Sequence, residues 1–255
     1  MKAIILAGGL GTRLQEETGV KPKPMVEIGG QPMLWHIMKI YSHFGIRDFA
    51  IAMGYKAGVI RAYFLNYYYH HCNLSINLQS GKINPIDGAA EDWNVFLADT
   101  GTATQTGGRL KKLSQWIGRE TFLFTYGDGV ADINIAQLID FHRTHGKLAT
   151  VTAVRPPSRF GGIVLEGSKV KDFVEKPQIG EGWINGGFFV LEPEALEYIH
   201  SDEMPFEKYP MEQLAADGQL MAYQHNGYWQ CMDTIRDMQH LENLWSSGSA
   251  PWKAW

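Results

Sequence analysis

The sequence predicts an α/β protein in which helices cover both faces of a mainly parallel sheet. Two observations predict this class. Short apolar runs such as 3–7 and 122–126 are typical of strands buried on both faces, and segments with helical periodicity stand between such runs. The chain has 255 residues, whereas a typical domain has about 150. We therefore expect one large domain or a domain with an added lobe.

The first 155 residues alternate between strands and helices, as a doubly wound sheet requires. Glycines directly follow several of the apolar runs, where loops at the carboxyl end of a sheet would begin. The expected strands are 3–7, 49–53, 122–126 and 149–154, with shorter candidates at 74–78 and 94–98. The expected helices are 32–44, 59–69 and 135–145.

The pattern changes after Pro156 and Pro157. Runs at 161–166, 170–175 and 186–191, separated by turn-forming residues, predict antiparallel strands that form a second, smaller lobe. The rest of the chain is expected to contain helices at 193–198 and 210–217, a strand at 220–223 and a closing helix at 234–245.

The composition argues against several classes of protein. The 23 basic and 27 acidic residues give a net charge of −4 without a run of Lys or Arg, so neither a nucleic acid nor a membrane surface is the expected partner. Cys72 and Cys231 are far apart and form no disulfide or metal motif, so we expect a cytoplasmic protein. Glycine is enriched, at 28 of 255 residues, against an average of about 7%.

A glycine-rich loop follows the first predicted strand. It runs from Leu6 to Leu14, and Lys21 and Lys23 follow it in a Lys-Pro-Lys-Pro sequence. Glycines let backbone N–H groups approach an anion closely, and Arg13 and a lysine would supply the positive charge that a triphosphate needs. Leu14 stands where a dinucleotide-binding fingerprint needs its last glycine, which argues against an NAD-dependent oxidoreductase. A plain turn with solvated charges is the alternative.

These motifs resemble those of the sugar-phosphate nucleotidyltransferases, which join a nucleoside triphosphate to a sugar 1-phosphate and release pyrophosphate. The resemblance extends from Met1 to the C-terminus and is strongest to the cytidylyl-transferring members. It is carried by GGLGTRL at 8–14 with KPKP at 21–24, YGDG at 126–129, VEKP at 174–177 and NGG at 185–187, and, for the cytidylyl enzymes, by DTG at 99–101, TGGRL at 106–110 and APWK at 250–253.

The resemblance implies a Rossmann-like α/β/α sandwich with a mixed, mainly parallel central sheet and a small antiparallel sugar-binding lobe. Residues 1–255 would form a single nucleotidyltransferase domain. Within it we expect a nucleotide-binding core at about 1–155, a sugar-binding portion at about 156–230, and a C-terminal helix and tail at about 231–255.

The resemblance also implies a role for each motif. Arg13 would neutralise the β- and γ-phosphates, Lys23 the α-phosphate, and Asp128 would act in catalysis as a metal ligand together with Asp233. The implied nucleotide-binding residues are Leu6, Ala7, Gly8, Gly9, Gly11, Thr12, Arg13, Lys23, Thr104, Arg109 and Gly127. The implied sugar-phosphate-binding residues are Glu175, Lys176, Asn185 and Gly186.

Several of these residues also have simpler interpretations. An Asp between two glycines, such as Asp128, is commonly a turn residue, and Asp233 is placed as in the N-cap region of the last helix. Lys21 competes with Lys23 for the role at the α-phosphate, and Lys23 is preferred because it follows the proline that ends the loop. Glu175 and Lys176 could form an exposed strand end, and Asn185 a hairpin turn.

CTP and glucose 1-phosphate are the partners that the resemblance implies, with Mg²⁺ as cofactor and a place in dideoxyhexose synthesis for cell-surface polysaccharide. A homo-oligomer is also expected, because Trp245, Trp252 and Trp255 suit a C-terminal docking segment. UTP or dTTP could replace CTP. The alternative from another class is a non-catalytic regulatory subunit that binds sugar nucleotides, against which the retained charged residues of the motifs argue.

Overall fold

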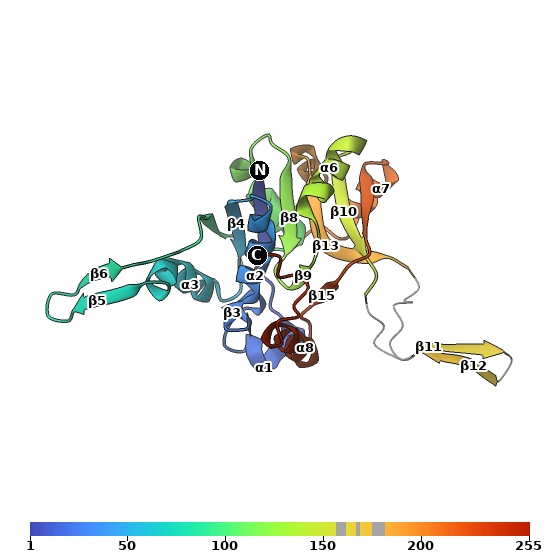
Figure 1. Ribbon diagram of the computed structural model, residues 1–255. Coiled ribbons are helices and arrows are strands. Elements are labelled where there is room, and N and C mark those ends of the chain that lie inside the picture. The colour runs from blue at the N-terminus through green and yellow to red at the C-terminus, as the bar shows by residue number, and fades with distance from the viewer. Residues whose placement is uncertain (157–161, 167–168, 175–181) are drawn as a thin grey trace.

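The computed structural model describes residues 1–156, 162–166, 169–174 and 182–255, and these residues form a seven-stranded central sheet (Figure 1). The strand β13 runs antiparallel to both of its neighbours, whereas the other pairs are parallel. The predicted mixed, mainly parallel sheet is confirmed. Its order is β14 (Leu220–His225), β10 (Ala149–Val154), β13 (Ile184–Leu191), β8 (Phe122–Tyr126), β1 (Lys2–Ala7), β4 (Asp48–Met53) and β7 (Asn94–Asp99).

Helices cover both faces of the sheet, because the central strands are apolar on both sides. In β1, Ile5 belongs to one buried cluster and Ile4 to the other, as alternation along a strand requires. The Ile5 cluster includes residues of α2 (Met33–His43), α3 (Ala57–His70), α6 (Ile135–His145) and α8 (Ile235–Ser246). The Ile4 cluster includes residues of α4 (Thr106–Lys112), α5 (Ser114–Ile117), the 3₁₀ segment η3 (Pro193–Tyr198) and α7 (Tyr209–Ala216).

One element of the expected second lobe lies elsewhere. The strand predicted at 186–191 is β13, and it pairs with β8 and β10 inside the central sheet. This expectation was wrong because the run from Phe188 to Leu191 is buried on both faces, a pattern typical of a central strand. The other two expected strands, β11 (Gly162–Glu166) and β12 (Lys169–Val174), pair with each other as an antiparallel ribbon.

Shorter elements complete the described chain. The hairpin of β5 and β6 projects from the body at the left of Figure 1, and every residue of its two strands is exposed. The short elements are η1 (Thr12–Leu14), α1 (Gln15–Thr18), η2 (Lys23–Met25), β2 (Glu27–Ile28), β3 (Gln31–Pro32), β5 (Asn73–Asn77), β6 (Lys82–Ile86), β9 (Gly129–Ala131) and β15 (Trp229–Cys231).

The C-terminal tryptophans pack against their own chain. Trp252 is 1% exposed, and its ring stacks on Trp245 of α8 and lies beside His36 of α2. Trp255 contacts the ring of Trp35, also in α2. These tryptophans therefore dock the tail onto α2 within the subunit. Among the described helices none combines the length and the apolar character needed to span a membrane.

Candidate active site

A cavity of about 280 Å³ lies at the carboxyl ends of β1 and β8. Ligands of open α/β sheets bind at this edge, because the loops that follow parallel strands gather there. Nine of the lining residues were expected from the sequence, whereas Pro24, Thr106 and Tyr126 were missed. The lining residues are Leu6, Ala7, Gly9, Gly11, Thr12, Arg13, Lys23, Pro24, Thr106, Tyr126, Gly127 and Asp128.

The missed residues stand inside the motifs but were given no role of their own. Tyr126 is the first residue of YGDG at 126–129 and Pro24 the last of KPKP at 21–24, so membership of a motif was the available signal for both. Thr106 begins α4, which the sequence pattern did not predict as a helix.

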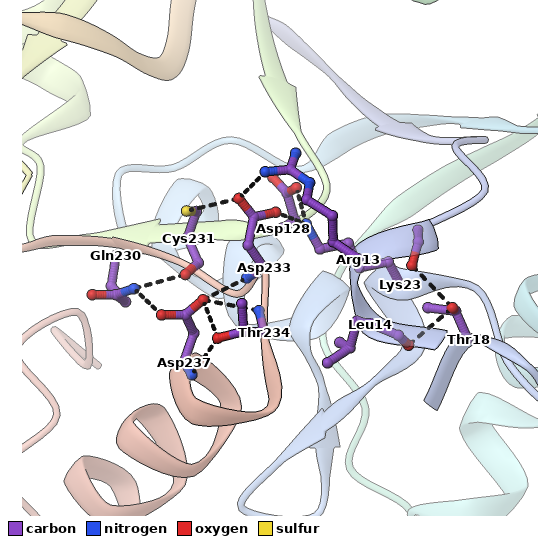
Figure 2. Close-up of polar contacts among 11 residues, drawn as sticks. Arg13, Leu14, Thr18, Lys23, Asp128, Gln230, Cys231, Asp233, Thr234 and Asp237 are labelled. Carbon is purple, nitrogen blue, oxygen red and sulfur yellow. Dashed lines mark hydrogen bonds and ion pairs between the residues drawn. The ribbon is translucent and has the colours of Figure 1, made fainter. Parts of the chain in front are cut away.

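The glycine-rich loop has a conformation that requires its glycine. Gly11 has a φ of 64°, in the left-handed region, and a Cβ atom there would lie 2.7 Å from Cγ2 of Thr18. Oγ1 of Thr18 donates to the carbonyl oxygens of Gly11 and Leu14, at 3.0 and 2.9 Å (Figure 2). These bonds hold Arg13 at the cavity.

The pairing of two short strands brings Asp128 and Asp233 together. Cys231 of β15 is paired with Gly129 of β9, and the backbone N–H of Met232 donates to the carbonyl of Asp128 over 2.8 Å. Asp128 directly precedes Gly129, and Asp233 follows Cys231 by two residues. The two aspartates therefore meet although 105 positions (233 − 128) separate them in the sequence.

The start of α8 fixes the backbone of Asp233. Thr234 is the N-cap, and Oδ2 of Asp237 accepts hydrogen bonds from the backbone N–H groups of Asp233 and Thr234, at 3.1 and 2.9 Å. Such a capping box satisfies donors that a helix start leaves unpaired. Asp233 therefore lies beside an N-cap, as its simpler interpretation suggested, and also reaches the site.

Four charged residues converge at this point, as Figure 2 shows. Nζ of Lys23 lies 2.6 Å from Oδ2 of Asp128 and 2.6 Å from Oδ1 of Asp233. Nη1 of Arg13 lies 2.7 Å from Oδ2 of Asp233. The structure thus brings together the two cations and two acids that the sequence motifs singled out. Lys21 lies apart, where it pairs with Glu27 over 3.2 Å.

These contacts shift two pKa values. Burial by itself would lower the pKa of Lys23, but the carboxylates of Asp128 and Asp233 outweigh it and raise this pKa above its usual value. Burial would raise the pKa of Asp233, whereas the hydrogen bond and charge of Lys23 and the charge of Arg13 lower it below its usual value. Both shifts favour the charged forms of Lys23 and Asp233.

Asp128 and Asp233 have the chemistry of a divalent-cation site. Their carboxylates converge on one point, where the Lys23 ammonium stands. In the described part of the chain, no group of three or more His, Cys, Asp or Glu side chains gathers as a metal site. Mg²⁺ commonly binds one or two carboxylates and takes its other ligands from water and substrate phosphates. Two converging aspartates at the edge of this cavity therefore fit it.

Arg109 joins three loops at the edge of the sheet and is absent from the cavity lining. Its Nη1 donates to the carbonyl oxygens of Met53 and Gly101 at 3.0 and 2.8 Å and to Oγ1 of Thr100 at 2.6 Å. Nη2 donates to the carbonyl of Gly8 at 3.0 Å. The residue is 4% exposed, so this guanidinium holds the glycine-rich loop to the loops after β4 and β7.

The insert around Thr104 packs against the loop before α7. Oγ1 of Thr104, a buried side chain outside the cavity lining, accepts a hydrogen bond of 3.1 Å from Lys112. A Cβ atom on Gly108 would lie 2.4 Å from the carbonyl oxygen of Asp202, and one on Gly107 would lie 2.6 Å from that of Met204. These glycines allow a close approach of backbone to backbone.

The expected sugar contacts are described only in part. Glu175 and Lys176 lie outside the described residues. Nδ2 of Asn185 donates to the phenol of Tyr126 over 3.0 Å, so Asn185 reaches the cavity lining through that ring. The carbonyl of Gly186 accepts a hydrogen bond of 2.7 Å from Nε1 of Trp229.

Comparison with known proteins identifies the family of this chain. The family model described as nucleotidyl transferase matches residues 2–244. Proteins named glucose-1-phosphate cytidylyltransferase from Salmonella typhi and Salmonella typhimurium are 54% identical over 256 residues, which cover 100% of this chain and of each relative. A solved structure titled apo UDP-glucose pyrophosphorylase, 18% identical, has a TM-score of 0.69 over 97% of this chain and 98% of its own. The chain belongs to the nucleotidyl transferase family.

Proposed function

We propose that this protein transfers a cytidylyl group from CTP to glucose 1-phosphate, which yields CDP-glucose and pyrophosphate. The observation that carries the proposal is the convergence of Arg13, Lys23, Asp128 and Asp233 beside a cavity at the carboxyl edge of the sheet. The choice of CTP and of glucose 1-phosphate is supported by the relatives that share 54% identity over the full length.

The chemistry explains why these residue types are needed. A phosphate oxygen of the sugar phosphate attacks the α-phosphorus of CTP in line, and pyrophosphate leaves, so two anions that repel each other must be held together. Arg13, whose side chain is 74% exposed, can reach the departing β- and γ-phosphates. Lys23 would stabilise the charge that grows on the α-phosphate.

Charge balance supports the same assignment. The formal charges of Arg13 and Lys23 cancel those of Asp128 and Asp233. Asp128 and Asp233 would hold Mg²⁺, which would supply positive charge to offset that of the phosphates. Lys23 now contacts both carboxylates, so its ammonium would have to leave them in order to pair with a phosphate oxygen.

The nucleotide-binding part of the proposal rests on the glycine-rich loop and on Gly127, which line the cavity with the cations. Arg109 supports this part of the proposal because it holds the carbonyl of Gly8. Its direct contact with the base or ribose stays a prediction. The sugar side rests on Asn185 and Gly186. Glu175 and Lys176 stay predictions.

The proposal also covers the cellular compartment, the pathway and the oligomeric state of the enzyme. We place the reaction in the cytoplasm, where nucleoside triphosphates are made, and in the supply of activated sugars for cell-surface polysaccharide. A homo-oligomer is supported by the projecting β5–β6 hairpin, which exposes Ile76 and Ile83. Light scattering coupled to gel filtration tests it.

The experiment that tests the function is a pyrophosphate-release assay with glucose 1-phosphate and CTP, UTP, dTTP, ATP or GTP in turn, with and without EDTA. Rapid turnover with CTP that EDTA abolishes is expected. Preference for UTP or dTTP would overturn the assignment of the base. Nucleotide binding without turnover would favour the regulatory subunit instead.

A further inference from the structure

Glu207 lies at the rim of the cavity, in the loop before α7. Its Oε2 atom accepts a hydrogen bond of 2.6 Å from Oγ1 of Thr106, which lines the cavity. The carboxylate is also a near neighbour of the phenol of Tyr126, a second lining residue. Glu207 thus lies beside the start of α4 and the end of β8, next to two residues of the cavity lining.

The backbone that carries the exposed side chain of Glu207 is held in place by its neighbours. The preceding Phe206 is 1% exposed, and its ring packs edge-on against Phe124 and Phe189, with centroid distances of 5.6 and 5.9 Å. The backbone N–H of Phe206 donates to Oγ1 of Thr106 over 2.8 Å. An acceptor held in place in this way loses little conformational freedom when a ligand binds.

The phenol of Tyr126 stands between Asn185 and Glu207. Nδ2 of Asn185 donates to the phenol oxygen of Tyr126, so the phenol's own proton is free to point at Glu207. Oδ1 of Asn185 is itself held by the backbone N–H of Gly187 at 2.8 Å. Asn185, Tyr126 and Glu207 form what we call the polar edge of the cavity.

We infer that Glu207 is a specificity-determining residue whose carboxylate accepts a hydrogen bond from a hydroxyl group of the hexose in glucose 1-phosphate. This inference rests on the proposed function. A carboxylate offers about four acceptor positions, and the hydroxyl of Thr106 occupies one, so the exposed side chain retains capacity for a substrate. Tyr126 is then a positioning residue, because its proton orients the carboxylate.

The charge of Glu207 favours the sugar over the triphosphate as its ligand. A carboxylate repels phosphate oxygens, whereas a neutral hydroxyl donates to it in a charge-assisted hydrogen bond. The cations that suit phosphates, Arg13 and Lys23, belong to a different segment of the lining. The polar edge contains Asn185, the expected sugar contact. Ribose hydroxyls of the nucleotide could donate to the carboxylate in the same way. The experiment distinguishes hexose from ribose hydroxyls by using deoxy analogues of each substrate.

The test compares wild type, Glu207→Gln and Glu207→Ala in steady-state kinetics with glucose 1-phosphate and its 2-, 3-, 4- and 6-deoxy analogues. Glu207→Gln keeps the shape of the side chain and should lower kcat/KM for glucose 1-phosphate about 10- to 100-fold. The KM for CTP should stay within about twofold. For wild type, kcat/KM should be lower by a similar factor for one of the deoxy analogues than for glucose 1-phosphate. For Glu207→Ala the two values should be equal, because this variant lacks the carboxylate that binds the hydroxyl in question.

Glu203→Gln, in the same loop, removes the same charge from an exposed side chain and should leave all constants unchanged. Tyr126→Phe provides a second variant and should raise the KM for glucose 1-phosphate with little effect on that for CTP. The inference is overturned if Glu207→Gln leaves the sugar constants unchanged, or if discrimination is lost against 2′- or 3′-deoxy-CTP instead. Wild type without turnover on CTP and glucose 1-phosphate would overturn the proposed function, and this inference with it.

Discussion

Lys23 and Asp233 form a largely buried ion pair: Nζ lies 2.6 Å from Oδ1, and the two side chains are 11% and 12% exposed. Asp128 shares the same ammonium at 2.6 Å. Side chains expected to bind phosphate and metal therefore also contact one another. The pair keeps the lysine charged and in place at the cavity before substrates bind.

Lys23→Ala should lower kcat about 100- to 1,000-fold, because the charge that grows on the α-phosphate would lose its partner. The apparent affinity for glucose 1-phosphate should change much less, since Lys23 is assigned to the transition state. Steady-state assays of pyrophosphate release measure both constants. Lys21→Ala is the matched control and should have little effect, because Lys21 pairs with Glu27 at the surface. Equal losses in kcat and in sugar-phosphate affinity would contradict the role of Lys23.

Arg109→Met should lower the free energy of unfolding by about 2–4 kcal/mol, because several buried carbonyl oxygens would lose their donor. Urea unfolding measures this change, with Arg143→Met on the exposed side of α6 as the control. Since Arg109 holds the loop that binds the nucleotide, kcat/KM should fall by the same factor for CTP and for UTP. Unchanged stability with an altered preference between the two would show that Arg109 acts on the base directly.

Gly108→Ala should destabilise the protein by about 2–3 kcal/mol, because its Cβ would meet the backbone of Asp202 at 2.4 Å. Gly58, in α3, has open space around an added Cβ, so Gly58→Ala should stabilise the protein by about 0.5–1 kcal/mol. Thermal unfolding of both variants gives the comparison. Equal shifts in the same direction would be inconsistent with the packing described for α4.

His36 should make stability depend on pH. Burial lowers the pKa of His36 to about 4, while its usual value is 6.5. The unfolded chain therefore gains a proton first as the pH falls, so the free energy of unfolding should decrease between pH 6.5 and about 4, by up to about 3 kcal/mol. Nδ1 of His36 accepts from Nε1 of Trp252 at 3.4 Å, which also requires the neutral ring.

Urea unfolding of wild type and His36→Gln at several pH values checks this dependence. The difference between the two proteins should be greatest above pH 6.5 and should shrink as the pH falls. A difference that stays constant down to pH 4 would show that His36 is protonated equally in both states.

Local pattern was sufficient to predict most of the fold. The strand at 122–126 and the helix at 135–145 have the predicted bounds, because each has one clear periodicity and a glycine after its end. The placement of β13 in the central sheet depends on pairing with β8 and β10, which local pattern does not encode. The resemblance allowed Asp128 and Asp233 to be assigned to one site; the pairing of β9 with β15 explains how they meet.

In the cavity, too, some residues were predictable from the sequence and others were not. Residues in recognisable motifs, such as Arg13 and Lys23, were found from the sequence. Tyr126 and Glu207 were not assigned to the site because their importance comes from contacts across the fold. The close packing that Gly107 and Gly108 allow was not foreseen either, since the partner backbone lies almost one hundred residues away.

Phosphorus NMR of a reaction that contains the protein, CTP, glucose 1-phosphate and Mg²⁺ tests the central claim most directly. Attack on the α-phosphorus predicts that the signals of both substrates disappear together while pyrophosphate and the two phosphorus signals of CDP-glucose appear in equal amounts. Formation of CDP with orthophosphate, or CTP that stays intact beside unchanged glucose 1-phosphate, would contradict it.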